Sequence, residues 1–221
     1  ILLEGLNLEF SVTTRKGSNT FKLNNQSYNS YFFDNHKFDR ALIKKLETAD
    51  YILISIPPVN NEDIVIKNFS TFLNKCKWIT YLSATSVYGN HHGEWVNETS
   101  KTNPSSYNGL ARLNAENSWK NLAKKIDLPL QIFRLSGIYS VENNILKRLL
   151  SGQAKIVKKK NHFFSRIHVE DIANLLFYSM KKFKSNQIYN VSDDKPASQE
   201  EIASYGSKLL KVKSPVFLEL D

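Results

Sequence analysis

Stretches typical of buried strands alternate along most of this chain with stretches typical of amphipathic helices. The strand-like runs cover residues 8–14, 51–56, 78–82 and 130–135, and the helical patterns cover residues 40–47, 63–74 and 106–125. Alternation of this kind favours βαβ units, in which each helix crosses over between two parallel strands. The sequence therefore predicts an α/β fold, with a doubly wound parallel sheet that carries helices on both faces.

The spacing becomes less regular after residue 139. A helix is predicted over residues 143–151, followed by a basic loop or hairpin over 155–164. Two further helices, over 169–182 and 199–210, flank a strand over 187–191. No repeat, low-complexity tract or linker divides the chain. We expect a first portion over 1–140 and a second over 141–221, interleaved with the sheet as one compact unit.

Composition agrees with a folded protein that lies inside the cell. The 221 residues are 41% hydrophobic and 12% aromatic, which is enough for one substantial core. Cys76 is the only cysteine, so no disulfide can form within the chain and a reducing compartment is indicated. No apolar run approaches the length of a membrane span, and no signal peptide is visible. We expect a cytoplasmic protein without a membrane partner.

Two neighbouring segments carry the chemistry: YLSATSVYG at residues 81–89 and PSSYNGLARLNAE at residues 104–116. The first is a strand that opens into a turn rich in hydroxyl groups, and the second is a loop that leads into a long helix. Together they resemble the extended short-chain dehydrogenase/reductase family, the NAD-dependent epimerases and dehydratases. The resemblance implies a Rossmann-like fold with a small C-terminal substrate lobe.

In that family a Tyr-x-x-x-Lys pair opens the helix, and a Ser or Thr hydroxyl at the strand end orients the substrate oxygen. Counting back from Glu116, which matches the Glu that usually ends the motif, the Tyr position is Asn108 and the Lys position is Arg112. An Asn amide does not titrate, so Asn108 cannot move a proton. Arg112 stays charged and can still hold a ribose or phosphate, but it has no ionisable neighbour to tune.

Replacement groups for the missing proton carrier stand close by in the sequence. Tyr107 is one position from the motif, which turns its side chain by about 100° on a helix. Ala84 occupies the usual Ser/Thr position, so only the flanking hydroxyls of Ser83 and Thr85 can serve. The predicted catalytic set is therefore Ser83, Thr85, Tyr107, Asn108 and Arg112.

Four segments, at residues 49–58, 81–98, 164–173 and 187–198, resemble an atypical YeeZ-like subgroup of the same family. Members of that subgroup tend to lack the catalytic Tyr and often the Lys. The resemblance therefore implies a cofactor-binding fold more firmly than it implies a reaction.

The end of the first strand-like run indicates the cofactor. An acidic residue there would bind the ribose 2′-OH of NAD, whereas basic residues suit the 2′-phosphate of NADP. Arg15 and Lys16 favour NADP(H), and NAD is the alternative. If these residues bind no ligand, they form a solvated basic turn. Other cofactor contacts are implied by the resemblance. The predicted cofactor-binding set is Thr14, Arg15, Lys16, Asp34, Asn35, Ser55, Ile56, Pro57, Pro58, Arg112, Leu135, Ser136 and Gly137.

The start of the chain differs from the family pattern. In the family a first strand and a G-x-G-x-x-G turn precede a helix. Residues 1–5 resemble the last turn of that helix. No Gly-x-Gly occurs among the eight glycines here. We expect that the first strand and glycine-rich turn are absent from this chain, and that both ends of a longer protein are missing.

Several histidines could have either a catalytic or a structural role. His91 and His92 follow the VYG turn and could replace the missing Tyr, but a surface loop is the preferred interpretation. His168 could also act, with Asp171 as its orienting carboxylate. The preferred interpretation, by resemblance to the family, is a joint between a strand and a helix where the acid caps the helix or orients the backbone. No spacing of His, Cys, Asp and Glu indicates a metal site.

The net charge of +9 suits an anionic partner. The densest cluster, Lys155, Lys158, Lys159 and Lys160, has no interleaved aromatic residues in the sequence, so we do not expect nucleic acid. A nucleotide-sugar or phosphorylated ligand explains the charge as well. A homodimer is expected by analogy with the family only.

Three functions remain open from the sequence. The leading one is an NADP(H)-dependent oxidoreductase or epimerase/dehydratase acting on a nucleotide-sugar-like small molecule. The alternative is a catalytically inert protein that binds NADP(H) as a sensor or regulator. The third is a scaffold that has lost the cofactor.

Overall fold

The centre of the computed structural model is a parallel sheet of four strands in the order β11-β7-β6-β5. The structure describes residues 9–17, 19–23, 26–73 and 75–219. The strands are β5 (Tyr51–Ile54), β6 (Trp78–Ala84), β7 (Leu130–Leu135) and β11 (Gln187–Val191). All four were predicted, within two residues at each end. The predicted α/β class with a parallel sheet is confirmed.

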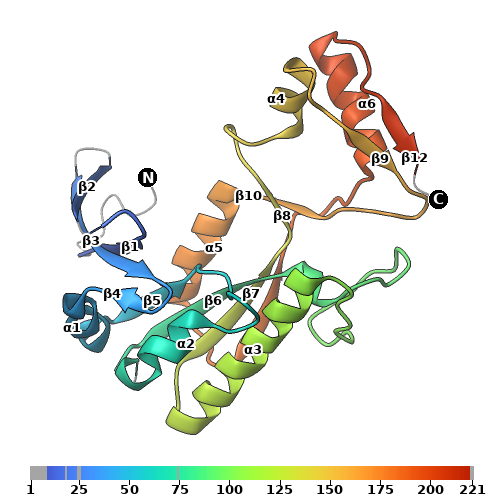
Figure 1. The fold of residues 1–221 in the computed structure, drawn as a ribbon. Coiled ribbons are helices and arrows are strands. Elements are labelled where there is room, and N and C mark those ends of the chain that lie inside the picture. Colours follow the sequence, from blue (N-terminus) through green and yellow to red (C-terminus); the bar gives the residue numbers. More distant parts are fainter. Residues whose placement is uncertain (1–8, 18, 24–25, 74, 220–221) are drawn as a thin grey trace.

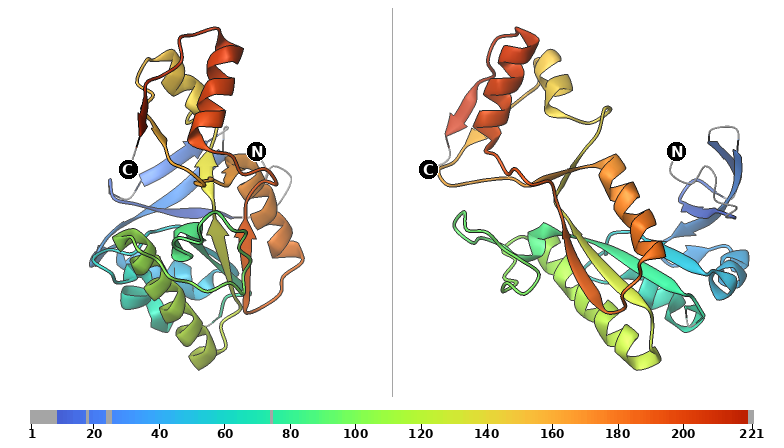
Figure 2. Two further views of the ribbon diagram at one scale, coloured as in Figure 1. Left: turned by 90° about the vertical axis from the view of Figure 1, so that its right-hand side faces the viewer. Right: turned by 180° about the vertical axis from the view of Figure 1, so that it is seen from behind.

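Helices cover both faces of this sheet (Figure 1). α2 (Ile64–Phe69) and α3 (Tyr107–Ile126) lie on one face, and α5 (Val169–Lys181) lies on the other (Figure 2). The alternation of side chains along β6 accounts for contacts with helices on both faces, because successive side chains of a strand point to opposite faces. Tyr81 stacks on Trp119 of α3, with ring centroids 6.1 Å apart. Trp78, three residues earlier, donates instead from its indole N–H to Ser179 Oγ of α5, at 3.3 Å.

The first part of the chain forms a separate small sheet in the order β1-β3-β2. β1 (Ser11–Thr14) is parallel to β3 (Gln26–Asp34), and β2 (Asn19–Leu23) is antiparallel to it. β4 (Lys37–Phe38) pairs with the end of β3, and α1 (Arg40–Thr48) follows. β2 was not predicted. The prediction for residues 1–5 lies outside the described residues.

A small lobe stands apart from the central sheet (Figure 1). It contains α4 (Ile145–Leu150), β9 (Ile156–Lys158), α6 (Gln199–Leu210) and β12 (Phe217–Glu219). Ile156 and Ala203 are buried in its own apolar core. β9 pairs in parallel with β12, so the hairpin alternative for residues 155–164 was wrong.

Two short strands join the lobe to the main body. β8 (Gly137–Tyr139) follows β7 after one residue, and β10 (Arg166–His168) pairs with it in parallel. The chain then returns through α5 to β11 of the central sheet, so the two parts of the chain interleave. No helix among the described residues is long and apolar enough to cross a membrane.

Candidate functional site

A cavity of about 260 Å³ opens at the carboxyl ends of three strands. It is lined by Thr13, Thr14, Arg15, Phe33, Asp34, Asn35, Ser55, Ile56, Pro57, Val59 and Ile64. Seven of these residues were predicted to bind the cofactor, although they come from three separate segments. Ligands of open α/β sheets bind at this end of the strands. The structure thus brings most of the predicted cofactor set together around one cavity.

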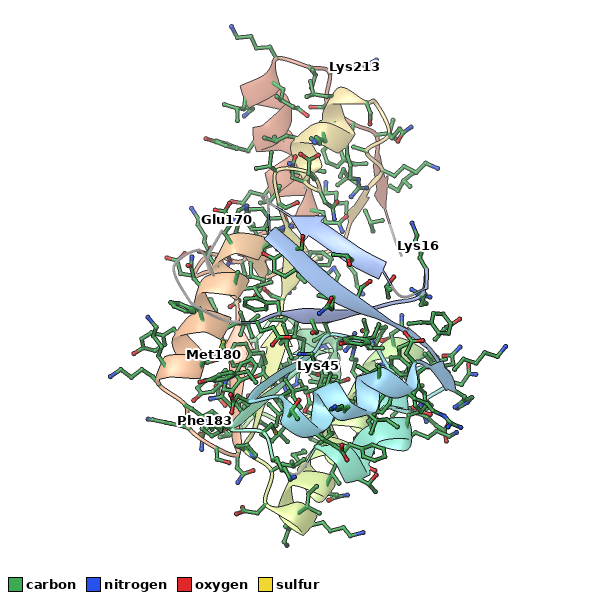
Figure 3. All side chains as sticks on the ribbon, turned by 90° about the vertical axis from the view of Figure 1, so that its left-hand side faces the viewer. Lys16, Lys45, Glu170, Met180, Phe183 and Lys213 are labelled. Carbon is green, nitrogen blue, oxygen red and sulfur yellow. The ribbon has the colours of Figure 1, made fainter. Side chains whose placement is uncertain are left out.

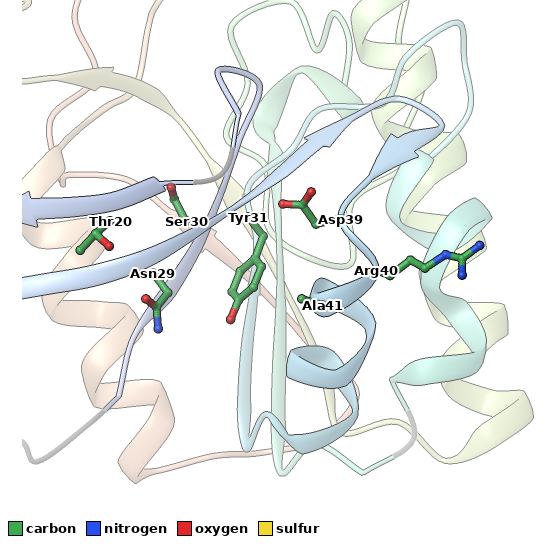
Figure 4. Close-up of a pocket in the computed structure, with 7 residues that line it drawn as sticks. All are labelled: Thr20, Asn29, Ser30, Tyr31, Asp39, Arg40 and Ala41. Atoms are coloured by element: carbon green, nitrogen blue, oxygen red, sulfur yellow. The ribbon is translucent and has the colours of Figure 1, made fainter.

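A second hollow, of about 670 Å³, is larger but lies elsewhere (Figure 4). It is lined by Thr20, Asn29, Ser30, Tyr31, Asp39, Arg40 and Ala41. These residues come from the sides of β2 and β3 and from the start of α1, and Arg40 points away from the strand residues. None of the predicted site residues lines it. We therefore place the candidate site at the smaller cavity, where the strand ends meet.

Local turns present the polar side chains of the cavity. Thr14 Oγ1 accepts a hydrogen bond from the Lys16 backbone N–H at 3.1 Å, which folds the chain directly after β1. Arg15 lines the cavity from this turn, whereas Lys16 does not line it and extends away from the body (Figure 3). Asn35 has a φ of 54°, which Asn adopts more readily than most residues. That turn places Asp34 and Asn35 at the mouth of the cavity.

A turn and a helix cap position Val59 and Ile64, which line the cavity. Val59 and Glu62 exchange two backbone hydrogen bonds, of 2.8 and 2.9 Å, around the turn that follows Pro58. Asp63 then caps α2 by accepting from the backbone N–H groups of Val65 and Ile66. The same carboxylate accepts from the indole N–H of Trp119 at 2.8 Å. Burial raises the pKa of Asp63.

Ser83 is turned into the protein. Its hydroxyl donates to Glu116 Oε1 at 2.6 Å, and the residue is only 3% exposed. Glu116 also receives two hydrogen bonds from the Arg134 guanidinium, at 3.0 and 2.7 Å. Ser83 therefore belongs to a buried polar network and does not face a substrate in this structure. Thr85 is half-buried in the turn that follows, and its side chain has no hydrogen-bond partner among the described residues.

The start of α3 lies against the turn that carries Thr85. A Cβ built on Gly109 would lie 2.7 Å from the Ser86 carbonyl oxygen, so only glycine permits this approach. Ser106 caps the helix by accepting from the Gly109 N–H at 3.1 Å. Tyr107 is 66% exposed and Asn108 is exposed. Thr85, Tyr107 and Asn108 thus share one end of the sheet.

Arg112 also points inward. Its Nη1 donates to the Leu82 carbonyl oxygen at 2.7 Å and to the Tyr81 hydroxyl at 3.3 Å. The guanidinium lies 5.9 Å from the centroid of the Tyr81 ring. Burial raises the pKa of Tyr81 to about 12. Arg112 therefore ties α3 to β6, a contact that the sequence did not reveal.

Three predicted cofactor residues, Leu135, Ser136 and Gly137, lie at the end of β7, two strands from β5. Ser136 donates from both its N–H and its hydroxyl to the Val191 carbonyl oxygen, each at 3.0 Å. Leu135 and Ser136 are buried, and Gly137 is exposed. Because β6 and β7 follow β5 in the sheet, Ser55, Thr85 and Gly137 lie at one edge. Leu135, Ser136, Gly137, Pro58, Lys16 and Arg112 do not line the cavity.

The histidines have structural contacts. His91 Nε2 lies 3.0 Å from the Lys101 carbonyl oxygen, within its own loop. His168 is itself the N-cap of α5, where Nδ1 accepts from the Glu170 N–H at 3.4 Å. His168 therefore takes the capping role, so the alternative in which Asp171 caps this helix was wrong. No group of three or more His, Cys, Asp or Glu side chains that could hold a metal is found in the described part of the chain.

Sequence reasoning missed the buried pair of Glu116 and Arg134 as a structural unit. Their side chains are 0% and 3% exposed. The available signal was Arg134 within a strand that is mostly apolar, since a buried charge requires a partner. Thr13, Phe33, Val59 and Ile64 of the cavity wall were also missed, and they carry no chemical signal.

The fold defines an α/β protein of the Rossmann-like type. Comparison with family models matches residues 66–192, more than half of the chain, to the NAD dependent epimerase/dehydratase family. The chain belongs to this family. A comparison with curated proteins finds no match.

Solved structures share this fold. One is a conserved protein of unknown function from Silicibacter pomeroyi, which is 35% identical with a TM-score of 0.71. The match covers 76% of this chain and 60% of that relative, so the chain spans under two thirds of its length. Another is UDP-N-acetylglucosamine 4-epimerase from Bacillus cereus, at 14% identity and a TM-score of 0.76, covering 99% of this chain and 80% of that one.

A third solved structure is a complex. It is UDP-glucuronic acid 4-epimerase from Bacillus cereus with NAD, at 18% identity and a TM-score of 0.69. The match covers 86% of this chain and 69% of that one. At this identity the likeness shows the fold alone. Membership of the YeeZ-like subgroup stays a prediction.

Proposed function

We propose that this protein binds NADP(H) and is an oxidoreductase or epimerase/dehydratase acting on a nucleotide-sugar-like small molecule. The observation that carries the proposal is the cavity of about 260 Å³ at the strand ends. Three segments that are distant in sequence contribute seven predicted cofactor residues to it. A cavity whose walls are mostly apolar, with a few polar groups and Arg15 among its lining residues, suits the adenosine and phosphate portion of a dinucleotide.

The preference for NADP(H) over NAD(H) rests on Arg15. Its guanidinium is the cation that lines the cavity, and it matches the geometry of a phosphate group. Asp34 and Asn35, at the end of the neighbouring strand β3, would accept and donate hydrogen bonds to the adenine. Ser55 to Pro57 would contact the pyrophosphate and ribose as the ligand extends along the edge of the sheet.

The cofactor, when bound, supplies hydride chemistry. Thr85 is the hydroxyl that we assign to orient the substrate oxygen, because Ser83 is committed to Glu116. Tyr107 is the group assigned to move the proton, since Asn108 has no titratable group. The exposed position of Tyr107 at the first turn of α3 leaves its phenol free to approach a ligand.

A second candidate, a catalytically inert NADP(H) sensor, is supported by one specific observation. Arg112 occupies the position of the family Lys, but it hydrogen-bonds to Leu82 and Tyr81 of the neighbouring strand. With Asn108 in the Tyr position, neither member of the usual pair is available for proton transfer. A cofactor cavity without a working pair suits binding better than turnover.

Titration of NADPH and NADH fluorescence tests the proposal. Saturable binding that prefers NADPH, and that an Arg15→Asp variant weakens at least tenfold, is expected. Lys124→Asp serves as the matched control, because it makes the same charge change at an exposed site at the far end of α3. A loss of NADPH affinity of the same size in both variants would point to general charge attraction. If the protein bound neither nucleotide, the only remaining function would be a scaffold that has lost the cofactor.

Turnover separates the two binding functions. If the protein is an oxidoreductase or epimerase, it should convert nucleotide sugars. The rate of conversion should fall in a Tyr107→Phe variant, while NADPH affinity stays unchanged. The sensor predicts binding with no conversion. The division into portions 1–140 and 141–221, the homodimer and the cytoplasmic location stay predictions.

A further inference from the structure

The short helix α2 contributes to the lining of the cofactor cavity in two ways. Ile64, its first residue, lines the cavity directly. Asn68, in its last turn, donates from Nδ2 to the carbonyl oxygen of Asn35 at 2.8 Å, and Asn35 lines the same cavity from the turn after β3. A helix of six residues is too short to be stable alone, so tertiary contacts set its position. The shape of the cavity therefore depends on what holds α2 in place.

Two side chains of α3 hydrogen-bond to the start of α2 and to the turn before it. The Trp119 indole N–H donates to Asp63 Oδ2 at 2.8 Å, and Asn114 Nδ2 donates to Asn61 Oδ1 at 3.0 Å. Asp63 immediately precedes α2, and Asn61 lies in the turn that follows Val59. Both donors belong to α3, so this helix supports the part of the chain that lines the cavity.

Asp63 does more than cap α2. Capping needs only a neutral acceptor, and the caps of α3, α4 and α6 are Ser106, Asn144 and Ser198. Asp63 is buried, and a buried carboxylate costs free energy unless its oxygens are paired. Oδ1 accepts from two backbone N–H groups at the start of α2, and Oδ2 accepts from Trp119. The second oxygen, which a serine cap could not supply, joins α2 to α3.

Trp119 is itself fixed against the central sheet. Its side chain is fully buried, and its ring stacks on Tyr81 of β6. Arg112, on the same helix, donates to the Leu82 carbonyl oxygen of β6. α3 is therefore a fixed support for α2, and its first turn carries Tyr107, the assigned proton carrier. The same helix supports the cavity lining and presents Tyr107.

We propose that Asp63 is a positioning residue for cofactor binding, which couples occupancy of the cavity to Trp119 of α3; this inference rests on the proposed function. A ligand that packs against Ile64 contacts the first turn of α2, and the Asp63 carboxylate transmits any displacement of that turn to the indole. The coupling is reciprocal. Loss of the bond between Asp63 and Trp119 leaves α2 less ordered, and the ligand must then restore that order at a cost in affinity.

The NMR resonances of the indole N–H groups provide a direct test, because the hydrogen bond of an indole affects its chemical shift. Isotope-labelled protein gives one such resonance for each of Trp78, Trp95 and Trp119. Trp78→Phe and Trp95→Phe variants identify the first two, which leaves the third for Trp119. During a titration with NADP⁺ we expect the Trp119 resonance to shift saturably while the Trp78 resonance stays in place. In an Asp63→Asn variant, the Trp119 resonance should no longer respond to NADP⁺.

The affinity for NADP⁺, measured by calorimetry, provides a second test. It should fall about fivefold in Asp63→Asn and in Trp119→Phe. Trp78→Phe is the matched control, because it also removes a buried indole N–H, which donates to Ser179 on the other face of the sheet. This control should lower the free energy of unfolding and leave the affinity for NADP⁺ unchanged.

Two results would overturn the inference and leave the proposed function intact. One is an unchanged affinity for NADP⁺ in both Asp63→Asn and Trp119→Phe, and the other is a Trp119 resonance that does not move when the parent protein is saturated. An equal loss of affinity in Trp78→Phe would also overturn it, in favour of a general effect of lower stability. A parent protein that binds no NADP⁺ would overturn the inference together with the proposed function.

Discussion

Glu116 of α3 and Arg134 of β7 form a buried ion pair, with Arg134 Nη2 2.7 Å from Glu116 Oε2. The pair is the centre of a network in which Ser83 donates to Glu116 and Arg134 donates to the Tyr88 hydroxyl at 2.9 Å. Four polar side chains from three elements and a turn are thus satisfied within the protein. The network explains why Ser83 is unavailable to a substrate.

Removing one partner of this pair should leave an uncompensated buried charge. We expect Glu116→Gln to lower the free energy of unfolding by about 3–5 kcal/mol. Chemical denaturation measures the loss, and Glu62→Gln, which breaks the exposed pair with Lys67, should leave the midpoint unchanged. A Glu116→Gln/Arg134→Met variant should recover part of the loss. A Glu116→Gln variant as stable as the parent protein would contradict the burial of this ion pair.

Tyr81 should make stability depend on alkaline pH. Its side chain is fully buried, and burial raises the pKa of Tyr81 from 10.0 to about 12. The fold therefore favours the neutral phenol. This contribution is complete below pH 10 and is lost as the pH rises from 10 to 12, by about 2 to 3 kcal/mol in all.

Urea denaturation between pH 8 and pH 11.5 measures this loss. Tyr81→Phe should reduce the alkaline decline, because no phenol remains to ionise. Tyr205→Phe, at an exposed site, controls for the loss of a tyrosine. Identical declines in the parent protein and Tyr81→Phe would exclude Tyr81 as the source.

Arg112 should act on stability more than on cofactor affinity. An Arg112→Gln variant loses the hydrogen bond to the Leu82 carbonyl oxygen and leaves that group less well satisfied. We expect the free energy of unfolding to fall by about 1–2 kcal/mol, while NADPH affinity changes less than threefold. A tenfold loss of affinity at unchanged stability would show instead that Arg112 turns outward to hold the ribose.

Gly109 should tolerate no side chain. A Cβ there would meet the Ser86 carbonyl oxygen at 2.7 Å and Pro104 Cβ at 2.9 Å. We expect Gly109→Ala to destabilise the protein by about 1–3 kcal/mol, more than the gain of about 1 kcal/mol from helix propensity. Asn117→Ala, at an exposed position of the same helix, should be neutral or slightly stabilising. A more stable Gly109→Ala variant would show that the turn at Thr85 can move away.

The strands of the central sheet were predictable because their signal is local. β7 matches its prediction at both ends, since a short, mostly apolar run bounded by turn formers has few alternatives. β2 was missed because its pairing with β3 depends on a hairpin rather than on a strong apolar run. The parallel pairing of β9 with β12 was missed because it joins residues about sixty positions apart.

For the candidate site, sequence by itself determined the residue types: the absence of a titratable group at Asn108, the cations at Arg15 and Lys16, and the hydroxyls at Ser83 and Thr85. Only the tertiary structure decided which of them face a ligand. It turned Ser83 toward Glu116 and Arg112 toward Leu82, and it set Arg15 beside Asp34 and Ser55. It also placed Gly93, in the loop after the VYG turn, against Asn161 after β9. The direction of a polar side chain depends on partners that are distant in sequence, because a buried polar group must be satisfied by whichever element packs against it.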